Sequence, residues 1–187
     1  VGDDGILVLT PEPTSVENAY SFLRAAFYRR LRLAMTSESA RRLVNQAMDQ
    51  GNERGIRTPL DLLREVRAIA PEEGLRLTAA IQRFRPRIVV NTVRSAEDVR
   101  LGFAVRSVCR KYFGIAADYV GYVNHDDAVT QAIRQRRPVV VTHPHADAAV
   151  YLTRIARKLL QSGGPGRATR APRATAQAGV AARRPTV

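Results

Sequence analysis

The sequence predicts an α/β domain with a parallel sheet, because three short apolar runs rich in β-branched residues alternate with helical patterns. The runs are Ile6–Thr10 (ILVLT), Ile88–Val93 (IVVNTV) and Asp118–Val123 (DYVGYV). After each run, apolar residues recur at steps of three and four, which is typical of an amphipathic helix. Parallel strands need right-handed crossovers. The carboxyl ends of the three strands should therefore meet at one edge of the sheet, where ligands bind in open α/β folds.

Two prolines mark the end of the first strand. Pro11 and Pro13 have no backbone N–H to donate to a ladder, so pairing should stop at Thr10. Thr14 and Glu17 stand at capping-box spacing, which predicts that the first helix begins there. The apolar stripe of this helix contains Val16, Ala19, Tyr20, Leu23, Phe27 and Leu31.

The next block, residues 36–85, is predicted to be a helical insertion. A helix over 41–50 is broken by Gly51–Arg57. The run Thr58-Pro59-Leu60-Asp61 then supplies an N-cap, a proline at the first helical position and an acid in the first turn. The expected core contacts are Leu60, Leu63, Val66 and Ala70 in this helix, and Leu75, Ile81 and Phe84 in the helix over 72–84.

Another capping pattern follows the second strand. Ser95 with Asp98 predicts a helix start, and Gly114 should end that helix. Its expected buried residues are Val99, Phe103, Val105, Val108, Tyr112 and Phe113.

Two further helices are expected after the third strand, over 128–136 and over Asp147–Leu160. The first of them is opened by Asp126 and Asp127. Residues 162–187 are rich in Arg, Ala and Pro and carry no bulky apolar residue beyond single valines. Such a segment buries too little apolar surface to offset its ordering entropy, so a disordered tail is predicted after a domain of residues 1–161.

The composition adds three constraints. There are 30 Lys and Arg residues against 17 Asp and Glu, a net charge of +13, which makes nucleic acid or another anionic surface a candidate partner. The single cysteine, Cys109, excludes an internal disulfide framework and fits a reducing, cytoplasmic location. No apolar run approaches the roughly 20 residues of a membrane-spanning helix.

Polar residues at the predicted strand ends are the candidate ligand contacts. Asn91 carries a donor and an acceptor side by side, the pattern that pairs with an adenine edge, although its position alone favours a turn or cap role. Glu12 lies between two prolines on a stiffened loop and faces either a ligand or solvent. Asn124, Asp126 and Asp127 are candidates for ligand contact, and capping is the simpler role for each.

The sequence gives little support for a metal site or a catalytic site. His143, His145 and Asp147 alternate in one loop, but a metal needs converging ligands with supporting partners, so capping is the favoured role and no metal is expected. Cys109 has apolar neighbours at helical spacing and is predicted to be a core residue. No Gly-rich loop followed by Gly-Lys-Ser/Thr occurs, nor any convincing Ser/His/Asp or Cys/His arrangement, so no catalytic residue is predicted.

Four segments in order resemble the later half of MinD/ParA-type ATPases, most closely the flagellar-number regulators of the FlhG/FleN type. They are LVLTPEPTSVENAY, IVVNTV with SAEDV, DYVGYVNHDDAVTQAI and RRPVVVTHPHADAAVYLTRIARKL, and together they span roughly residues 5–160. The resemblance implies a partial P-loop NTPase sheet with its amino-terminal half missing. That half would carry the phosphate-loop lysines, the switch carboxylate and the Mg²⁺ ligand.

The resemblance also assigns roles at the strand ends. Asn91 is similar in position to the adenine-reading asparagine, and Glu12 to the residue that faces the partner subunit's nucleotide. Asn124–Asp126 resembles the base-flanking loop, with Asn124 in place of the usual proline. The implied cofactors are ATP and Mg²⁺ in the full-length parent, which forms a homodimer in its ATP state. The tail lacks the apolar stripe of a membrane-binding helix, so a membrane partner is not expected.

Three functional hypotheses follow. The first is a carboxyl-terminal fragment of such an ATPase, inactive in hydrolysis alone because nothing in it would stabilise the transition-state charge. The second is a non-enzymatic basic module that binds nucleic acid through three arginine clusters. The third is a degenerate regulatory subunit that pairs with an intact ATPase. The arginine clusters are Arg29, Arg30 and Arg32, then Arg41 and Arg42, then Arg134, Arg136 and Arg137.

Overall fold

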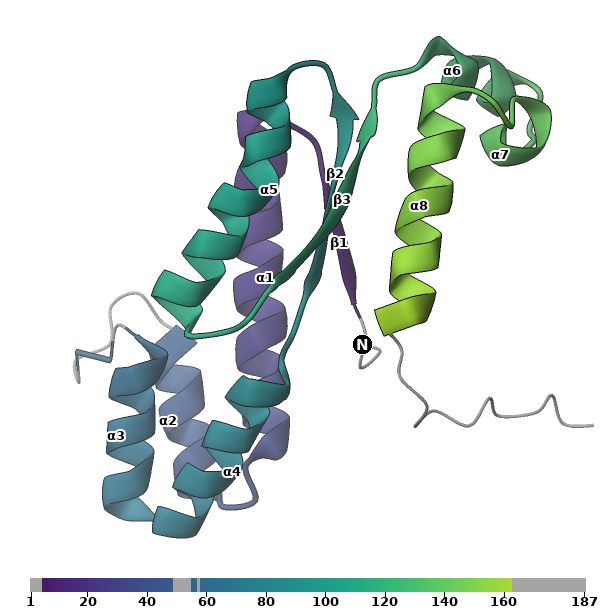
Figure 1. The fold of residues 1–187 in the computed structure, drawn as a ribbon. Coiled ribbons are helices and arrows are strands. Elements are labelled where there is room, and N and C mark those ends of the chain that lie inside the picture. The colour runs from purple at the N-terminus through teal and green to yellow at the C-terminus, as the bar shows by residue number, and fades with distance from the viewer. Residues whose placement is uncertain (1–4, 49–54, 57, 163–187) are drawn as a thin grey trace, which may run out of the picture.

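The computed structural model describes residues 5–48, 55–56 and 58–162. Strands and helices alternate in the order that the sequence predicts, with the helical insertion between the first two strands (Figure 1). The elements are β1 (Ile6–Leu9), α1 (Pro13–Ala34), α2 (Glu38–Met48), α3 (Pro59–Ile69), α4 (Pro71–Arg83), β2 (Arg87–Val93), α5 (Ala96–Val108), the π-helical turn η1 (Cys109–Phe113), β3 (Asp118–Asn124), α6 (Asp127–Arg134), α7 (Val139–Thr142) and α8 (Asp147–Ser162).

The three strands form one parallel sheet in the order β1-β2-β3, so the predicted fold class is confirmed at the level of an α/β parallel sheet. Ile6 pairs with Arg87 on one side of β2, and Arg87 pairs with Asp118 on the other. The β2–β3 register shifts between Val90 and Val93, where Thr92 takes a φ of 60°. This irregularity lies at the carboxyl end of β2 and bends the chain toward α5.

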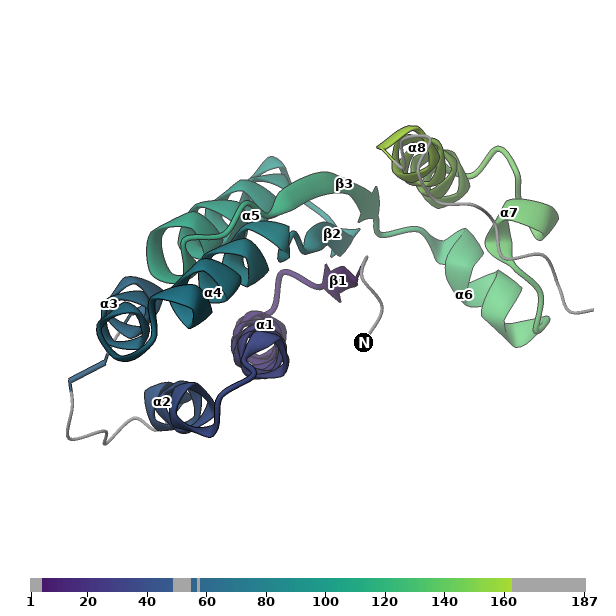
Figure 2. The ribbon, with the colours of Figure 1, turned by 90° about the horizontal axis from the view of Figure 1, so that it is seen from below.

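The two faces of the sheet are covered unequally (Figures 1 and 2). On one face α1 and α5 enclose the main core, in which Phe27 contacts the rings of Phe84 and Phe113 at centroid distances of 5.4 and 5.5 Å. On the other face α8 packs against β3, and the smaller core there contains Val89, Val120, Val123, Ala148 and Ile155. Parallel sheets are normally buried on both faces. In this sheet the α8 face is covered by fewer buried residues than the α1 face, and we call it the thin side.

The block over residues 36–85 is helical in its described residues, where α2, α3 and α4 pack together and continue the main core. Its buried carboxylate, Glu73, accepts hydrogen bonds from the backbone N–H of Thr36 at 3.0 Å and of Ser37 at 2.7 Å. These hydrogen bonds, together with one from the Thr36 hydroxyl, lower the pKa of Glu73. Glu73 therefore ties α4 to the junction between α1 and α2.

The predicted start of α1 at Thr14 is one residue late, and the capping box predicted there is wrong. The helix begins at Pro13, with Glu12 as N-cap, and Thr14 and Glu17 form no capping box. Proline suits the first helical position because its missing N–H would have no helical partner there. The backbone N–H of Thr10 is instead satisfied by the Ser15 hydroxyl at 2.9 Å. The boxes predicted at Thr58–Asp61 and Ser95–Asp98 are confirmed.

Several residues expected in the core are exposed, namely Tyr20, Leu60, Leu75, Phe103 and Tyr112. In α3 the buried stripe runs through Leu62 and Val66, and in α4 through Leu77 and Ala80. At the end of α5 the π-helical turn η1 changes the helical phase, so Phe113 turns inward while Tyr112 faces solvent. Gly114 then ends this segment in the left-handed conformation, as predicted.

Two other expectations concern the end of the chain. The last helix is confirmed and runs to Ser162, two residues past the predicted Leu160. The predicted disordered tail, apart from Ser162, falls outside the described residues. In the part of the chain that the structure describes, every helix is too short or too polar to cross a membrane.

Candidate functional site

The carboxyl ends of β2 and β3 open into a hollow of about 670 Å³. It lies between the start of α5 and the loop that leads from β3 into α6, at the end of the sheet where the arrowheads of Figure 1 point. Its walls come from two loops and from the start of α8. The lining residues are Val93, Arg94, Ser95, Ala96, Val99, Tyr122, Asn124, His125 and Asp147.

The first wall is the turn from β2 into α5, and two of its backbone donors are bound by a side chain of the same turn. Asp98 accepts hydrogen bonds from the backbone N–H of Arg94 at 2.8 Å and of Ser95 at 3.0 Å. These bonds, the one from Arg94 first, lower the pKa of the Asp98 carboxyl. Asp98 thus takes two of the backbone donors at this turn, those of Arg94 and Ser95. The side chain of Arg94 is exposed at the rim.

The second wall is the β3–α6 loop, which is fixed by Asp126. The two Asp126 oxygens accept hydrogen bonds from the backbone N–H of Ala128 at 2.9 Å and of Ala148 at 3.0 Å. The bond from Ala148 is the main cause of a lowered Asp126 pKa. Asp126 therefore caps α6, as the simpler sequence interpretation held, and also joins α6 to α8. It lies behind the hollow and is not among its lining residues.

Asn124 faces the hollow itself. Its amide nitrogen donates to the Asp147 carboxylate at 2.6 Å, which orients the side chain and leaves the amide oxygen as an acceptor for a ligand. The two walls are joined nearby, because the backbone N–H of His125 donates to the Val93 carbonyl at 2.8 Å. The hollow therefore has a defined polar wall and suits a planar ligand that donates a hydrogen bond.

Asn91 and Glu12 lie at the same edge but outside the hollow. Asn91 is exposed near the end of β2 and, by strand alternation, shares the sheet face of Val89, the α8 side. Glu12 is exposed at the start of α1, where the Thr10 hydroxyl donates to its carboxylate. The structure thus brings Asn124 to the hollow and Asp126 directly behind it. Asn91 and Glu12 remain free to meet a ligand or a partner from the open side.

The alternating histidines do not converge. His143 Nδ1 lies 2.9 Å from the Thr142 hydroxyl, and Asp147 is engaged with Asn124. Among the described residues, no group of three or more His, Cys, Asp or Glu side chains is placed to hold a metal ion. Cys109 lies in the main core, as predicted, and burial raises its pKa to about 11, so it stays a neutral thiol.

Sequence reasoning missed part of the hollow. Tyr122 lines it, and its hydroxyl lies 3.1 Å from that of Tyr151 on α8, with ring centroids 4.8 Å apart. The sequence held a usable signal, because Tyr122 precedes Asn124 by two residues and strand alternation places both on the same face of β3. Arg94 and His125 are loop residues about 30 positions apart, and no local pattern links them.

A comparison with protein-family models found no matching family, and a comparison with curated proteins found no match. The fold and the hollow define the class of the chain on their own. It is an α/β protein with a three-stranded parallel sheet, flanking helices and a polar hollow at the carboxyl ends of β2 and β3.

Proposed function

We propose that the chain is the later part of a MinD/ParA-type P-loop ATPase domain and holds the adenosine end of ATP in the hollow beside Asn124. The observation that carries this proposal is the place of the hollow. It lies at the carboxyl ends of adjacent parallel strands and is lined by Asn124, in the loop whose sequence resembles the family's base-flanking loop. Open α/β sheets bind ligands at this edge.

The residues of the hollow fit an adenine base better than a phosphate. The Asn124 amide oxygen is placed to accept from an exocyclic amine such as that of adenine. Asp98 takes the backbone N–H groups of Arg94 and Ser95 in the β2–α5 turn, so these two donors are not free for phosphates. The carboxylate that lines the hollow, Asp147, would suit guanine's donors but accepts from the Asn124 amide. These features favour adenosine over guanosine.

The open edge of β1 supports the rest of the proposal. Ile6 and Val8 are 48% and 58% exposed, although strands of parallel sheets are normally covered on both faces. A P-loop strand and its helix, supplied by the parent protein, would cover this edge and the α8-side face of β1. They would also bring the phosphate grip and the Mg²⁺ ligand. The residues described here supply neither, so this chain alone binds weakly and hydrolyses no ATP.

In the parent protein, ATP would complete a homodimer in which Glu12 faces the partner's nucleotide. Such a switch would act in the cytoplasm to position cellular structures, of the flagellar or division-site type. The exposure of Glu12 at the start of α1 is compatible with a contact across a dimer.

The alternative, a basic nucleic-acid-binding or regulatory module, is supported by the net charge of +13. Its three arginine clusters lie on α1, on α2, and at the end of α6 and just after it, and Figure 1 places α2 and α6 at opposite ends of the molecule. A continuous phosphate-binding track would join them on one face, so we favour the nucleotide proposal. Filter binding at two salt concentrations separates the two, because phosphate-driven binding falls steeply with salt.

The direct test is a titration of the 187-residue chain with adenosine, followed by NMR. We expect shift changes at Asn124, Tyr122 and the β2–α5 turn, weaker changes with guanosine, and about tenfold weaker adenosine binding in Asn124→Ala, as for one lost hydrogen bond. Asn45→Ala, the same change on the exposed side of α2, is the matched control. Equal response to both nucleosides, shifts confined to other regions, or steady ATP turnover by the chain alone would each contradict the proposal.

A further inference from the structure

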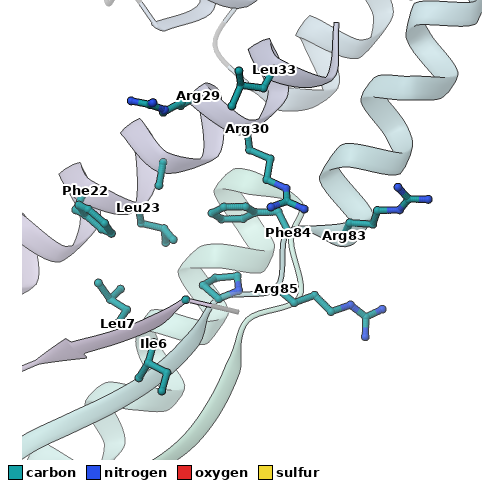
Figure 3. Close-up of a pocket in the computed structure, with 13 residues that line it drawn as sticks. Ile6, Leu7, Phe22, Leu23, Arg29, Arg30, Leu33, Arg83, Phe84 and Arg85 are labelled. Carbon is teal, nitrogen blue, oxygen red and sulfur yellow. The ribbon is translucent and has the colours of Figure 1, made fainter. Parts of the chain in front are cut away.

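A second hollow, of about 230 Å³, lies at the opposite end of the sheet from the nucleotide hollow. It is formed between α1 and the turn that joins α4 to β2, beside the start of β1 (Figure 3). Its floor is apolar and comes from Leu7 on β1, Leu23 on α1, and Phe84 and Pro86 in the turn. Nothing in this hollow is shared with the site around Asn124.

The rim of this hollow is cationic. Arg29 and Arg30 come from α1, Arg83 is the last residue of α4, and Arg85 lies in the α4–β2 turn. In Figure 3, Arg30 extends toward Phe84, while Arg83 and Arg85 point outward on the side opposite Arg29. The thirteen residues that line the hollow include four arginines and no Asp or Glu.

The described residues leave uncovered an apolar floor that is framed by like charges, which is an unusual surface. Beside the hollow, Phe22 is 61% and Leu33 is 76% exposed on the same side of α1. Exposed apolar patches bordered by polar residues commonly mark binding sites. Arginine stems pack along apolar surface while their guanidinium groups stay in water, so the heads can close over the charged end of a ligand.

We propose that this hollow binds a free medium-chain carboxylate, with its alkyl chain on the apolar floor and its carboxylate among the arginine side chains of the rim. Charge complementarity selects an anion, because every formal charge in the lining is positive. The volume selects a short chain, since it falls below the roughly 300–1,000 Å³ of pockets for drug-sized ligands. Arginine is suited to the head group because its planar fork pairs with a carboxylate through two parallel hydrogen bonds.

The test is calorimetric titration of the whole chain with octanoate below its micelle concentration, alongside octylammonium and butyrate. We expect octanoate to bind, octylammonium not to bind because of charge repulsion, and butyrate to bind at least about tenfold more weakly because it buries fewer methylenes. Higher salt should weaken octanoate binding, since the rim is exposed and screened.

Two variants and a control locate the site. Arg29→Gln/Arg83→Gln should weaken octanoate binding about tenfold or more by removing the charge-assisted hydrogen bonds. Arg134→Gln/Arg137→Gln removes the same net charge from α6 and the residues after it, and should change the affinity less than about twofold, because those charges are screened at this distance. Ala26→Phe should block binding by filling the hollow, and thermal melting checks that the variant is folded.

Other outcomes would overturn the proposal. They are no binding of octanoate, equal binding of octanoate and octylammonium, or equal losses in the two arginine pairs. Binding only to phosphatidylglycerol vesicles, with none to free octanoate, would replace the free carboxylate with an anionic bilayer as the partner.

Discussion

The two faces of the sheet differ in how they are packed, and the difference separates stability from ligand binding. On the α1 side, aromatic and aliphatic side chains from six helices and three strands form the main core, and Phe27, Leu31, Ile88 and Val90 are fully buried. On the α8 side, five buried residues hold one helix against β3. That thin side carries the loop of Asn124. The edge where we propose that a nucleoside binds therefore lies beside the smaller of the two cores.

The largest expected effect is on the thick side. Phe27→Ala should destabilise the chain by about 3–5 kcal/mol, because it removes a fully buried ring that contacts three other rings. Urea unfolding followed by circular dichroism measures the change. A loss below 1 kcal/mol would mean that the main core does not govern stability.

On the thin side, Ile155→Ala should cost about 2 kcal/mol, the lower end for such a truncation, because α8 can partly collapse onto the gap. Hydrogen exchange should show α8 opening while α1 stays protected. If both helices opened together, the two faces would be one cooperative unit and the comparison would fail.

A smaller effect is expected from pH. The folded pKa of Glu73 is lowered from its ordinary value of 4.5, so the stability that it contributes is complete above that value and is lost as pH falls through the folded pKa. In Glu73→Gln, the free energy of unfolding should decrease less steeply than in the unmodified chain as the pH is lowered from neutral into this acid range. Denaturant midpoints at several pH values test this, and an unchanged slope would show that another carboxylate dominates.

The smallest effect is expected at Leu75 in α4, and the buried Leu77 of the same helix is its control. Leu75→Ala should change stability by less than about 0.5 kcal/mol because the side chain is 69% exposed, whereas Leu77→Ala should cost about 2–4 kcal/mol. Parallel denaturation curves measure both. Similar losses would indicate that α4 is rotated relative to the structure.

The strands and the two confirmed capping boxes could be predicted because a few adjacent residues determine them. The buried stripes of α3 and α4 could not, since a helix with apolar residues on several sides is oriented by its neighbours, as Leu60 and Leu75 show. Glu73 and Thr36 meet across 37 positions, a distance that no local pattern spans. The same holds for the hollow: Asn124 was named from the sequence, but its contact with Asp147 depends on the docking of α8.

The Asp126 carboxylate couples the position of α8 to that of the β3–α6 loop. Because Asp126 binds the first turns of both α6 and α8, the β3–α6 loop cannot shift without pulling the start of α8. Near its other end, Lys158 of α8 donates to the carbonyls of Tyr119 and Val120 at 3.1 and 3.0 Å. The helix α8, with 16 residues and a length of about 24 Å, is thus held to the sheet at both ends. A label at exposed Leu160 would therefore register a movement that starts at the β3–α6 loop.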